Sequence, residues 1–143
     1  MKMITTTICF LLFIHRTVAS CDITDANFQD YVDEWITNST NHPCGEVIGD
    51  WDVSNVTDMS YVFCSISIFS KCNTARANFN EDLSGWNTSS VTSLEGTFRD
   101  ATSFNSDISQ WDTSSVTSLE DTFESATSFN SDISQWDTSS VEN

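Results

Sequence analysis

The chain has 143 residues, of which 21 are acidic and only five are lysine or arginine, giving a formal net charge of −16. All 21 acidic residues but only three of the five cationic ones lie beyond residue 20, so residues 21–143 carry about −18. This charge repels nucleic acid and anionic lipid, and no basic stripe is present to bind phosphates. The length fits one domain.

Residues 1–20 have the organisation of a secretory signal peptide. Lys2 is basic, residues 8–14 form a short apolar run, and Val18, Ala19 and Ser20 place small side chains before a cleavage site. The apolar run is too short to span a bilayer as a helix, and no second run follows. The sequence therefore predicts export to the outside or the surface of the cell, and no transmembrane segment.

Residues 21–48 are predicted to form an N-terminal capping helix and a linker. Apolar side chains recur there at helical spacing, at Phe28, Tyr31, Val32, Trp35 and Ile36, with acidic residues between them. This pattern indicates an amphipathic helix that starts at Thr24 or Asp25 and ends before residues 38–43. Such a helix can cover the end of a repeat array.

Four cysteines remain beyond residue 20, an even number that is typical of disulfides in an exported protein. Four cysteines allow three pairings. We expect Cys64 to pair with Cys72 across a short insertion, and Cys21 to pair with Cys44 across the predicted helix. The sequence Val18-Ala19-Ser20-Cys21 also fits a bacterial lipobox, in which Cys21 would carry lipid and no disulfide.

Residues 49–143 are an array of repeats. Trp86, Trp111 and Trp136 are 25 residues apart, and the block ATSFNSDISQWDTSSV occurs unchanged at 101–116 and 126–141. Looser copies begin at Trp51 and Phe79. The spacing from Trp51 to Trp86 is 35 residues. The extra residues fall within 64–78, between the cysteines of the second pair and just beyond them, and they indicate a surface insertion.

Each unit is predicted to hold one short helix and one short strand. The sequences at 92–95 and 117–120 (TSLE) read as capping boxes that open a helix. Residues 132–136 read as a short extended stretch, followed by a turn. The predicted fold class is therefore an α/β repeat, a short leucine-rich-repeat-like solenoid with an N-terminal helical cap. Phe98 should then stack on Phe123, and Ile108 on Ile133.

The repeat motifs WDVSNVTDMSYVF, FNEDLSGWNTSSVTSL and ATSFNSDISQWDTSSV resemble those of the BspA-type repeat surface proteins, a family that also includes mycoplasma surface lipoproteins. The resemblance covers residues 49–141, and the segment ANFQDYVDEWI resembles the helix that often precedes such arrays. It implies a leucine-rich-repeat-like solenoid, export and, in some members, adhesion to host or matrix proteins. It implies no catalytic residues. Leu94 and Leu119 stand where the family more often has methionine.

The recurring aspartates and tryptophans are the candidate chemical groups. Two aspartate columns (Asp82, Asp107 and Asp132; Asp52, Asp112 and Asp137) are expected to make turn and strand-edge hydrogen bonds, in preference to binding calcium or catalysing a reaction. The tryptophan column (Trp51, Trp86, Trp111 and Trp136) either stacks in the core or forms an exposed binding column. Sequons at Asn38, Asn55 and Asn87 are glycosylation candidates in a eukaryotic secretory route.

These observations favour a non-enzymatic interaction or adhesion module that binds an extracellular protein or glycan. We expect no catalytic residue, no metal site and no cofactor. The alternative is a structural component of an extracellular matrix or wall, which assembles through the open end of the array. The array stops before another helix would cover its last unit, so Ile133 and Trp136 should be more exposed than Ile108 and Trp111, and self-association through this end is expected.

Overall fold

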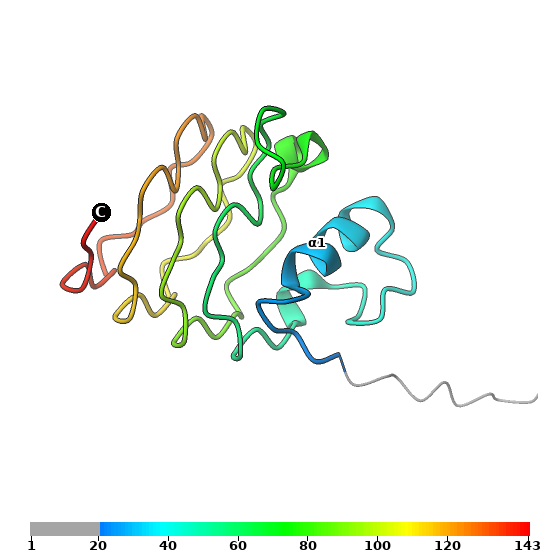
Figure 1. Ribbon diagram of the computed structural model, residues 1–143, viewed down its shortest axis with the longest axis horizontal. Coiled ribbons are helices and arrows are strands. Elements are labelled where there is room, and N and C mark those ends of the chain that lie inside the picture. Colours follow the sequence, from blue (N-terminus) through cyan, green and yellow to red (C-terminus); the bar gives the residue numbers. More distant parts are fainter. Residues whose placement is uncertain (1–20) are drawn as a thin grey trace, which may run out of the picture.

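The computed structural model describes residues 21–143, so the predicted signal peptide lies outside the described residues. This part of the chain contains one α-helix, α1 (Phe28–Thr37), and two short 3-10 helices, η1 (Ile48–Asp50) and η2 (Thr74–Asn78). The remainder winds in successive irregular coils, with α1 at one end and the C-terminus at the other (Figure 1). No helix within residues 21–143 has both the length and the apolar character needed to cross a membrane.

The predicted fold class, an α/β leucine-rich-repeat-like solenoid with a strand and a helix in every unit, is wrong. Across residues 49–143 the structure shows neither a strand nor an α-helix. Only isolated parallel bridges occur there, from Asp58 to Ser93 and from Ser93 to Ser118. The repeat units are therefore irregular coils.

The predicted capping boxes open no helix because the backbone turns left-handed directly after each one. The φ angle is 55° at Gly96 and 54° at Asp121, a conformation that ends a helix. The N–H groups that follow point at the neighbouring coil, and Phe98 N–H donates to the carbonyl of Thr122 at 2.9 Å. After the first of these sequences, N–H groups thus alternate between an acceptor in the next unit and one three residues earlier in the same unit, as from Thr97 to Leu94 at 3.1 Å.

The predicted strand at 132–136 is also absent, because an aspartate turns the chain there. The carboxylate of Asp132 accepts a hydrogen bond from the N–H of Ser134 at 2.9 Å, and Asp107 accepts one from Ser109 in the same way. These Asx turns give the backbone a local partner that competes with strand pairing. The same Asp-x-Ser sequence that disfavours a helix therefore disfavours a strand as well.

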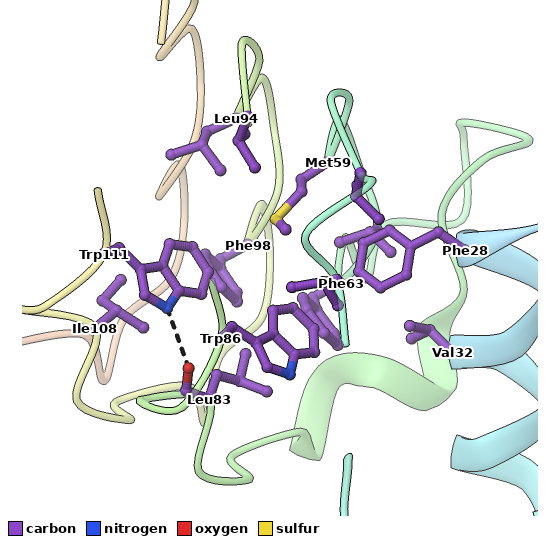
Figure 2. Close-up of a cluster of buried hydrophobic side chains, with 14 of the residues drawn as sticks. Phe28, Val32, Met59, Phe63, Leu83, Trp86, Leu94, Phe98, Ile108 and Trp111 are labelled. Atoms are coloured by element: carbon purple, nitrogen blue, oxygen red, sulfur yellow. Dashed lines mark hydrogen bonds between the residues drawn. The ribbon is translucent and has the colours of Figure 1, made fainter. Parts of the chain in front are cut away.

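Aromatic residues one repeat apart pack against one another in the core. The ring centroids of Phe98 and Phe123 are 5.7 Å apart, and those of Trp111 and Trp136 are 6.4 Å apart. The indole N–H of Trp111 donates to the carbonyl of Leu83 in the preceding coil at 3.1 Å (Figure 2). Residues 25 apart thus occupy equivalent places in neighbouring coils although the predicted elements do not form.

Helix α1 is present where a capping helix was predicted, but it starts later. Residues 24–27 form a turn in which the carbonyl of Thr24 accepts hydrogen bonds from Asn27 and Phe28, both at 3.0 Å. Phe28 and Val32 are buried and face the core, with the Phe28 ring 5.6 Å from that of Trp86 (Figure 2). The apolar face of α1 therefore covers the N-terminal end of the coils.

Candidate functional site

The insertion at 64–78 interrupts the regular coils and is closed at its base. A disulfide joins Cys64 to Cys72, and the N–H of Asn73 donates to the carbonyl of Cys64 at 3.0 Å. A further bond runs from the N–H of Cys72 to the carbonyl of Phe69 at 3.1 Å. We call residues 64–72 the insertion loop. Its ends are fixed by covalent and backbone bonds, so its tip is held at a defined place.

Two adjacent apolar side chains are exposed at the tip of the insertion loop. Ile68 is 75% exposed and Phe69 is 39% exposed. The ring of Phe69 is not free, because it lies 6.0 Å from the ring of Tyr61 and 5.2 Å from the guanidinium of Arg99. Ile68 and the outer face of Phe69 therefore form a supported apolar patch on a strongly acidic protein.

The cationic side chains of the described residues gather around this loop. Arg76 is fully buried, Arg99 is mostly buried, and Lys71 is exposed with its ammonium 5.9 Å from the Tyr61 ring. Arg99 pairs with Asp121 and Glu124, both at 2.5 Å. Lys71 is thus the cation of this group that remains available to a partner.

Tyr61 supports the loop from the first coil. Its hydroxyl donates to the carboxylate of Glu95, and this bond is the largest of the effects that raise the pKa of Tyr61 to about 12. The ring lies so close to Gly96 that a Cβ at that position would overlap it. The absence of a Cβ at Gly96 therefore leaves room for the Tyr61 ring.

A polar cavity of about 720 Å³ lies between α1 and the insertion loop. Carboxylate, amide and hydroxyl groups line it, together with Lys71. Two smaller cavities, of about 220 and 180 Å³, share Lys71 as a lining residue. We use the term insertion surface for Ile68, Phe69, Lys71 and these cavities. The groups present can accept and donate hydrogen bonds and can pack against apolar groups of a partner.

Asp25 fixes the edge of the polar cavity to the first coil. Its carboxylate accepts hydrogen bonds from the N–H and the hydroxyl of Thr57, at 2.7 and 2.6 Å, and from the N–H of Asp58 at 3.1 Å. Burial pushes the pKa of Asp25 upward, but these hydrogen bonds outweigh that effect and leave its pKa below the ordinary value. Asp25 is therefore held as a carboxylate that is occupied by the protein's own donors.

His42 is buried away from solvent in a structural position. Its ring stacks on that of Trp51 with 5.0 Å between centroids, and its Nδ1 accepts a hydrogen bond from Cys44 N–H at 3.2 Å. Burial lowers the pKa of His42. Among residues 21–143, no group of three or more histidine, cysteine or carboxylate side chains is arranged to hold a metal ion.

The predicted site residues have clear positions. Both expected disulfides are present, Cys21 with Cys44 and Cys64 with Cys72. Of the two roles predicted for Cys21, disulfide bonding and lipid attachment, the structure therefore has the disulfide. The sequon residues Asn38, Asn55 and Asn87 are all exposed, and their glycosylation stays a prediction. The Asp-x-Ser aspartates form Asx turns, as Asp112 does with Ser114.

The tryptophan column is not an exposed binding column. Trp51, Trp86 and Trp111 are each only 4% exposed and lie in the core, while Trp136 is partly buried at the end of the coils. The indole N–H groups of Trp86, Trp111 and Trp136 donate to backbone carbonyls of the preceding turns of chain. The structure therefore supports the interpretation that these rings stack in the core.

Sequence reasoning placed the insertion and its disulfide but missed the residues at its tip. The sequence does contain a signal for these exposed residues. Ile68 and Phe69 are adjacent apolar residues in a segment that the other units lack, and a surface insertion offers apolar side chains no core to enter. The grouping of Lys71 and Arg99 around Phe69 joins residues 28 positions apart in sequence. That contact depends on how the coils stack and carries no local signal.

A family model described as "Mycoplasma protein of unknown function, DUF285" matches residues 24–76 and 37–143. The matches cover nearly all of the described chain, including α1, the insertion and the coils. The chain belongs to this family. No match was found among curated proteins or among solved structures. The two disulfides are typical of proteins that fold in an oxidising, extracellular environment.

Proposed function

We propose that this DUF285-family protein is a non-enzymatic, secreted or cell-surface interaction module that binds an extracellular protein through its insertion surface. The observation that carries the proposal is the exposure of Ile68 and Phe69 on a loop that a disulfide holds in place. Few large apolar side chains are exposed among the described residues, and these two are adjacent. Exposed apolar patches supported by rigid surroundings commonly mark protein contact sites.

The chemistry of the insertion surface fits a protein partner. Burying an isoleucine or phenylalanine side chain contributes about 1.5–3 kcal/mol, which suits the apolar centre of an interface. Lys71 and the polar cavity beside it supply hydrogen-bonding groups at the rim. The closed loop loses little conformational freedom on binding, so less of the interaction energy is spent on ordering it.

We also propose that the protein is related to the BspA-type repeat surface proteins. The motif resemblance at residues 49–141 favours it, and in that family some members adhere to host or matrix proteins. The coils then serve as a scaffold, and the insertion, which only one unit carries, provides the contact surface. A glycan partner would use the polar cavity in place of the apolar tip.

A binding screen with matched variants tests this proposal. The oxidised protein would be screened against extracellular matrix proteins and glycans, and each binder retested with the double variant Ile68→Ser, Phe69→Ser. We expect its affinity for a protein partner to fall by roughly tenfold or more, since hot-spot truncations cost over about 1.4 kcal/mol.

Val47→Ser is the matched control, because Val47 is 59% exposed and lies outside the insertion. Its affinity should stay at the wild-type level. Equal affinities of the double variant and the wild-type protein would overturn the insertion surface as the contact site. Binding only to glycans, unchanged in the double variant, would move the site to the polar cavity.

A further inference from the structure

One face of α1 contributes acidic side chains to the polar cavity. Asp30 and Asp33 are three residues apart on α1, so they lie on the same face of the helix. Both line the cavity, together with Asp25 from the turn before the helix. The insertion loop adds serine hydroxyls and Lys71 to the lining. The cavity therefore has a wall of carboxylates that belongs to α1 and the turn before it.

The three carboxylates differ in how far the protein's own donors occupy them. The carboxylate of Asp25 accepts three hydrogen bonds from the first coil. In Asp33, Oδ1 accepts a hydrogen bond from Asn73 at 2.7 Å and pairs with Arg76, and Oδ2 takes no part in these contacts. Asp30 is exposed and takes part in no ion pair within residues 21–143. Asp30 and the second oxygen of Asp33 are therefore available to a donor from outside.

The cationic side chains of the described residues leave the charge of Asp30 uncompensated. Residues 21–143 contain only three cations, Lys71, Arg76 and Arg99. Arg76 is buried against α1, and Arg99 pairs with carboxylates of the coil further on. The ammonium of Lys71 lies over the Tyr61 ring, 5.9 Å from its centroid. The cavity therefore favours a cationic group of a partner over an anionic one.

The polar cavity directly adjoins the apolar tip of the insertion loop. Ser67 and Ser70 line the cavity, and Ile68 and Phe69 lie between them in the sequence. Lys71 follows and also lines the cavity, and with Phe69 it lines the smaller cavity of about 220 Å³. A partner that packs on the tip therefore brings its neighbouring side chains to the polar cavity.

We propose that the partner binds with a basic segment, in which an apolar side chain packs on Ile68 and Phe69 and a neighbouring arginine or lysine enters the polar cavity to pair with Asp30. The proposal rests on the proposed function and adds the chemistry of the partner to it. The apolar contact supplies affinity, while the ion pair selects the partner and speeds its approach. An arginine can also donate to Oδ2 of Asp33, because a guanidinium carries several N–H donors.

An acidic partner and a second copy of this protein both fit the insertion surface poorly. An acidic segment would place like charge beside Asp25 and Asp30, which costs binding free energy. Two copies that met through their insertion surfaces would oppose the same carboxylates to one another. Within residues 21–143 the cations are too few and too far apart in sequence to form a basic segment. The charge of the surface therefore points to a different, basic chain.

Three matched synthetic peptides with capped ends serve as probes. Each has a Phe-Leu centre that is flanked on both sides by arginine, by glutamine or by glutamate. Titrated into the oxidised protein, the arginine peptide should bind saturably and roughly fivefold or more tightly than the glutamine peptide. The glutamate peptide should bind most weakly. Added salt should weaken binding of the arginine peptide and narrow these differences, because it screens the charges.

Nuclear magnetic resonance locates the bound peptide on the protein. The arginine peptide should shift the amide signals of Asp30, Ser67 and Ile68 and leave that of Asp107, an exposed aspartate of the coils, unchanged. The protein variant Asp30→Asn should lose the preference for arginine over glutamine. Glu34→Gln is the matched control and should keep it, because Glu34 is exposed on the same helix but does not line the cavity.

Several results would overturn the proposed partner chemistry. Equal affinities of the arginine and glutamate peptides would do so, as would a preference for arginine that survives in Asp30→Asn. Signal shifts spread over the acidic turns of the coils would show general attraction of charge and no site. The absence of saturable binding by the arginine peptide would also overturn it. So would a dimer in sedimentation that dissociates in the double variant Ile68→Ser, Phe69→Ser, because a second copy would then occupy the surface.

The same double variant separates failure of this proposal from failure of the proposed function. If it weakens all three peptides alike and the wild-type protein shows no preference for arginine, the insertion surface stays the contact site and only the basic partner is wrong. If it binds the arginine peptide as tightly as the wild-type protein does, the contact at the apolar tip is wrong and both proposals fail.

Discussion

The guanidinium of Arg76 forms an ion pair with the carboxylate of Asp33, with 2.6 Å between Nη2 and Oδ1. Arg76 is fully buried, and its Nη1 also donates to the carbonyls of Tyr61 and Lys71, both at 3.1 Å. One side chain thus joins α1, the first coil and the insertion loop. The pair fixes the insertion surface relative to the rest of the molecule.

Replacing Asp33 with alanine should lower the free energy of unfolding by about 3 kcal/mol, because it leaves a buried guanidinium without its counter-ion. Urea denaturation of the oxidised protein measures this change. Asp30→Ala is the matched control, since Asp30 is exposed on the same helix, and it should change stability by less than about 0.5 kcal/mol. Equal losses in the two variants would show that the ion pair does not stabilise the fold.

Removing the disulfide of the insertion loop should destabilise the protein. The cross-link spans 8 positions, and in the chain-entropy model closing so short a loop contributes roughly 2–3 kcal/mol. The double variant Cys64→Ser, Cys72→Ser should therefore unfold at lower urea concentration, while the bond from Cys21 to Cys44 stays intact. An unchanged urea midpoint would mean that the loop is held by its packing alone.

Acid should weaken the Asx turns. Hydrogen bonds from the hydroxyl and the N–H of Ser114 hold the pKa of Asp112 below its ordinary value. A carboxyl whose pKa is lower in the folded state stabilises the fold above its unfolded pKa, which is about 3.9 for aspartate. That stabilisation is lost as the pH falls through the lower, folded value.

The variant Asp112→Asn tests this effect, because asparagine keeps the turn but does not titrate. Asn87 already occupies the equivalent position, and its Oδ1 accepts hydrogen bonds from the N–H and the hydroxyl of Ser89 at 3.2 and 2.8 Å. The variant should therefore lose less stability than the wild-type protein when the pH is lowered from about 7 to about 3. Denaturation curves at both pH values measure the difference, and identical losses would argue against any contribution from Asp112.

The tryptophan column should stabilise the protein unevenly along its length. Trp111 is 4% exposed and packs between Trp86 and Trp136, with centroids 6.2 and 6.4 Å away. Trp111→Ala should therefore cost about 3–5 kcal/mol of unfolding free energy. Trp136→Ala should cost less than half as much, because Trp136 is only partly buried within residues 21–143. Equal costs would show that the two rings are equally buried in solution.

The sequence predicted which positions pack together more accurately than it predicted the secondary structure at those positions. The spacing of Trp86, Trp111 and Trp136 places equivalent residues in successive coils, because a fixed period brings them to the same point of each turn. The same spacing does not determine the backbone conformation. A TSLE sequence opens a helix only if the next residue keeps a negative φ, and Asp121 does not.

The candidate site shows the same division between local and long-range information. The pairing of Cys64 with Cys72 was predictable because the two lie close in sequence around an insertion. The pairing of Arg76 with Asp33 was not, since it spans 43 residues and arises only when α1 packs beside the insertion. The burial of the tryptophan rings also depends on the three-dimensional packing, because the 25-residue period does not determine which side of a coil faces the core.

Amide hydrogen exchange of two equivalent residues, Phe98 and Phe123, tests the central claim that backbone hydrogen bonds run between irregular coils. The N–H of Phe98 donates to the carbonyl of Thr122 in the next coil, and the N–H of Phe123 has no acceptor within residues 21–143. We expect Phe98 to exchange more slowly than Phe123 by roughly a hundredfold or more, because its exchange requires the coils to separate. Similar exchange rates at the two residues would contradict the claim and would indicate that each unit makes its backbone hydrogen bonds internally.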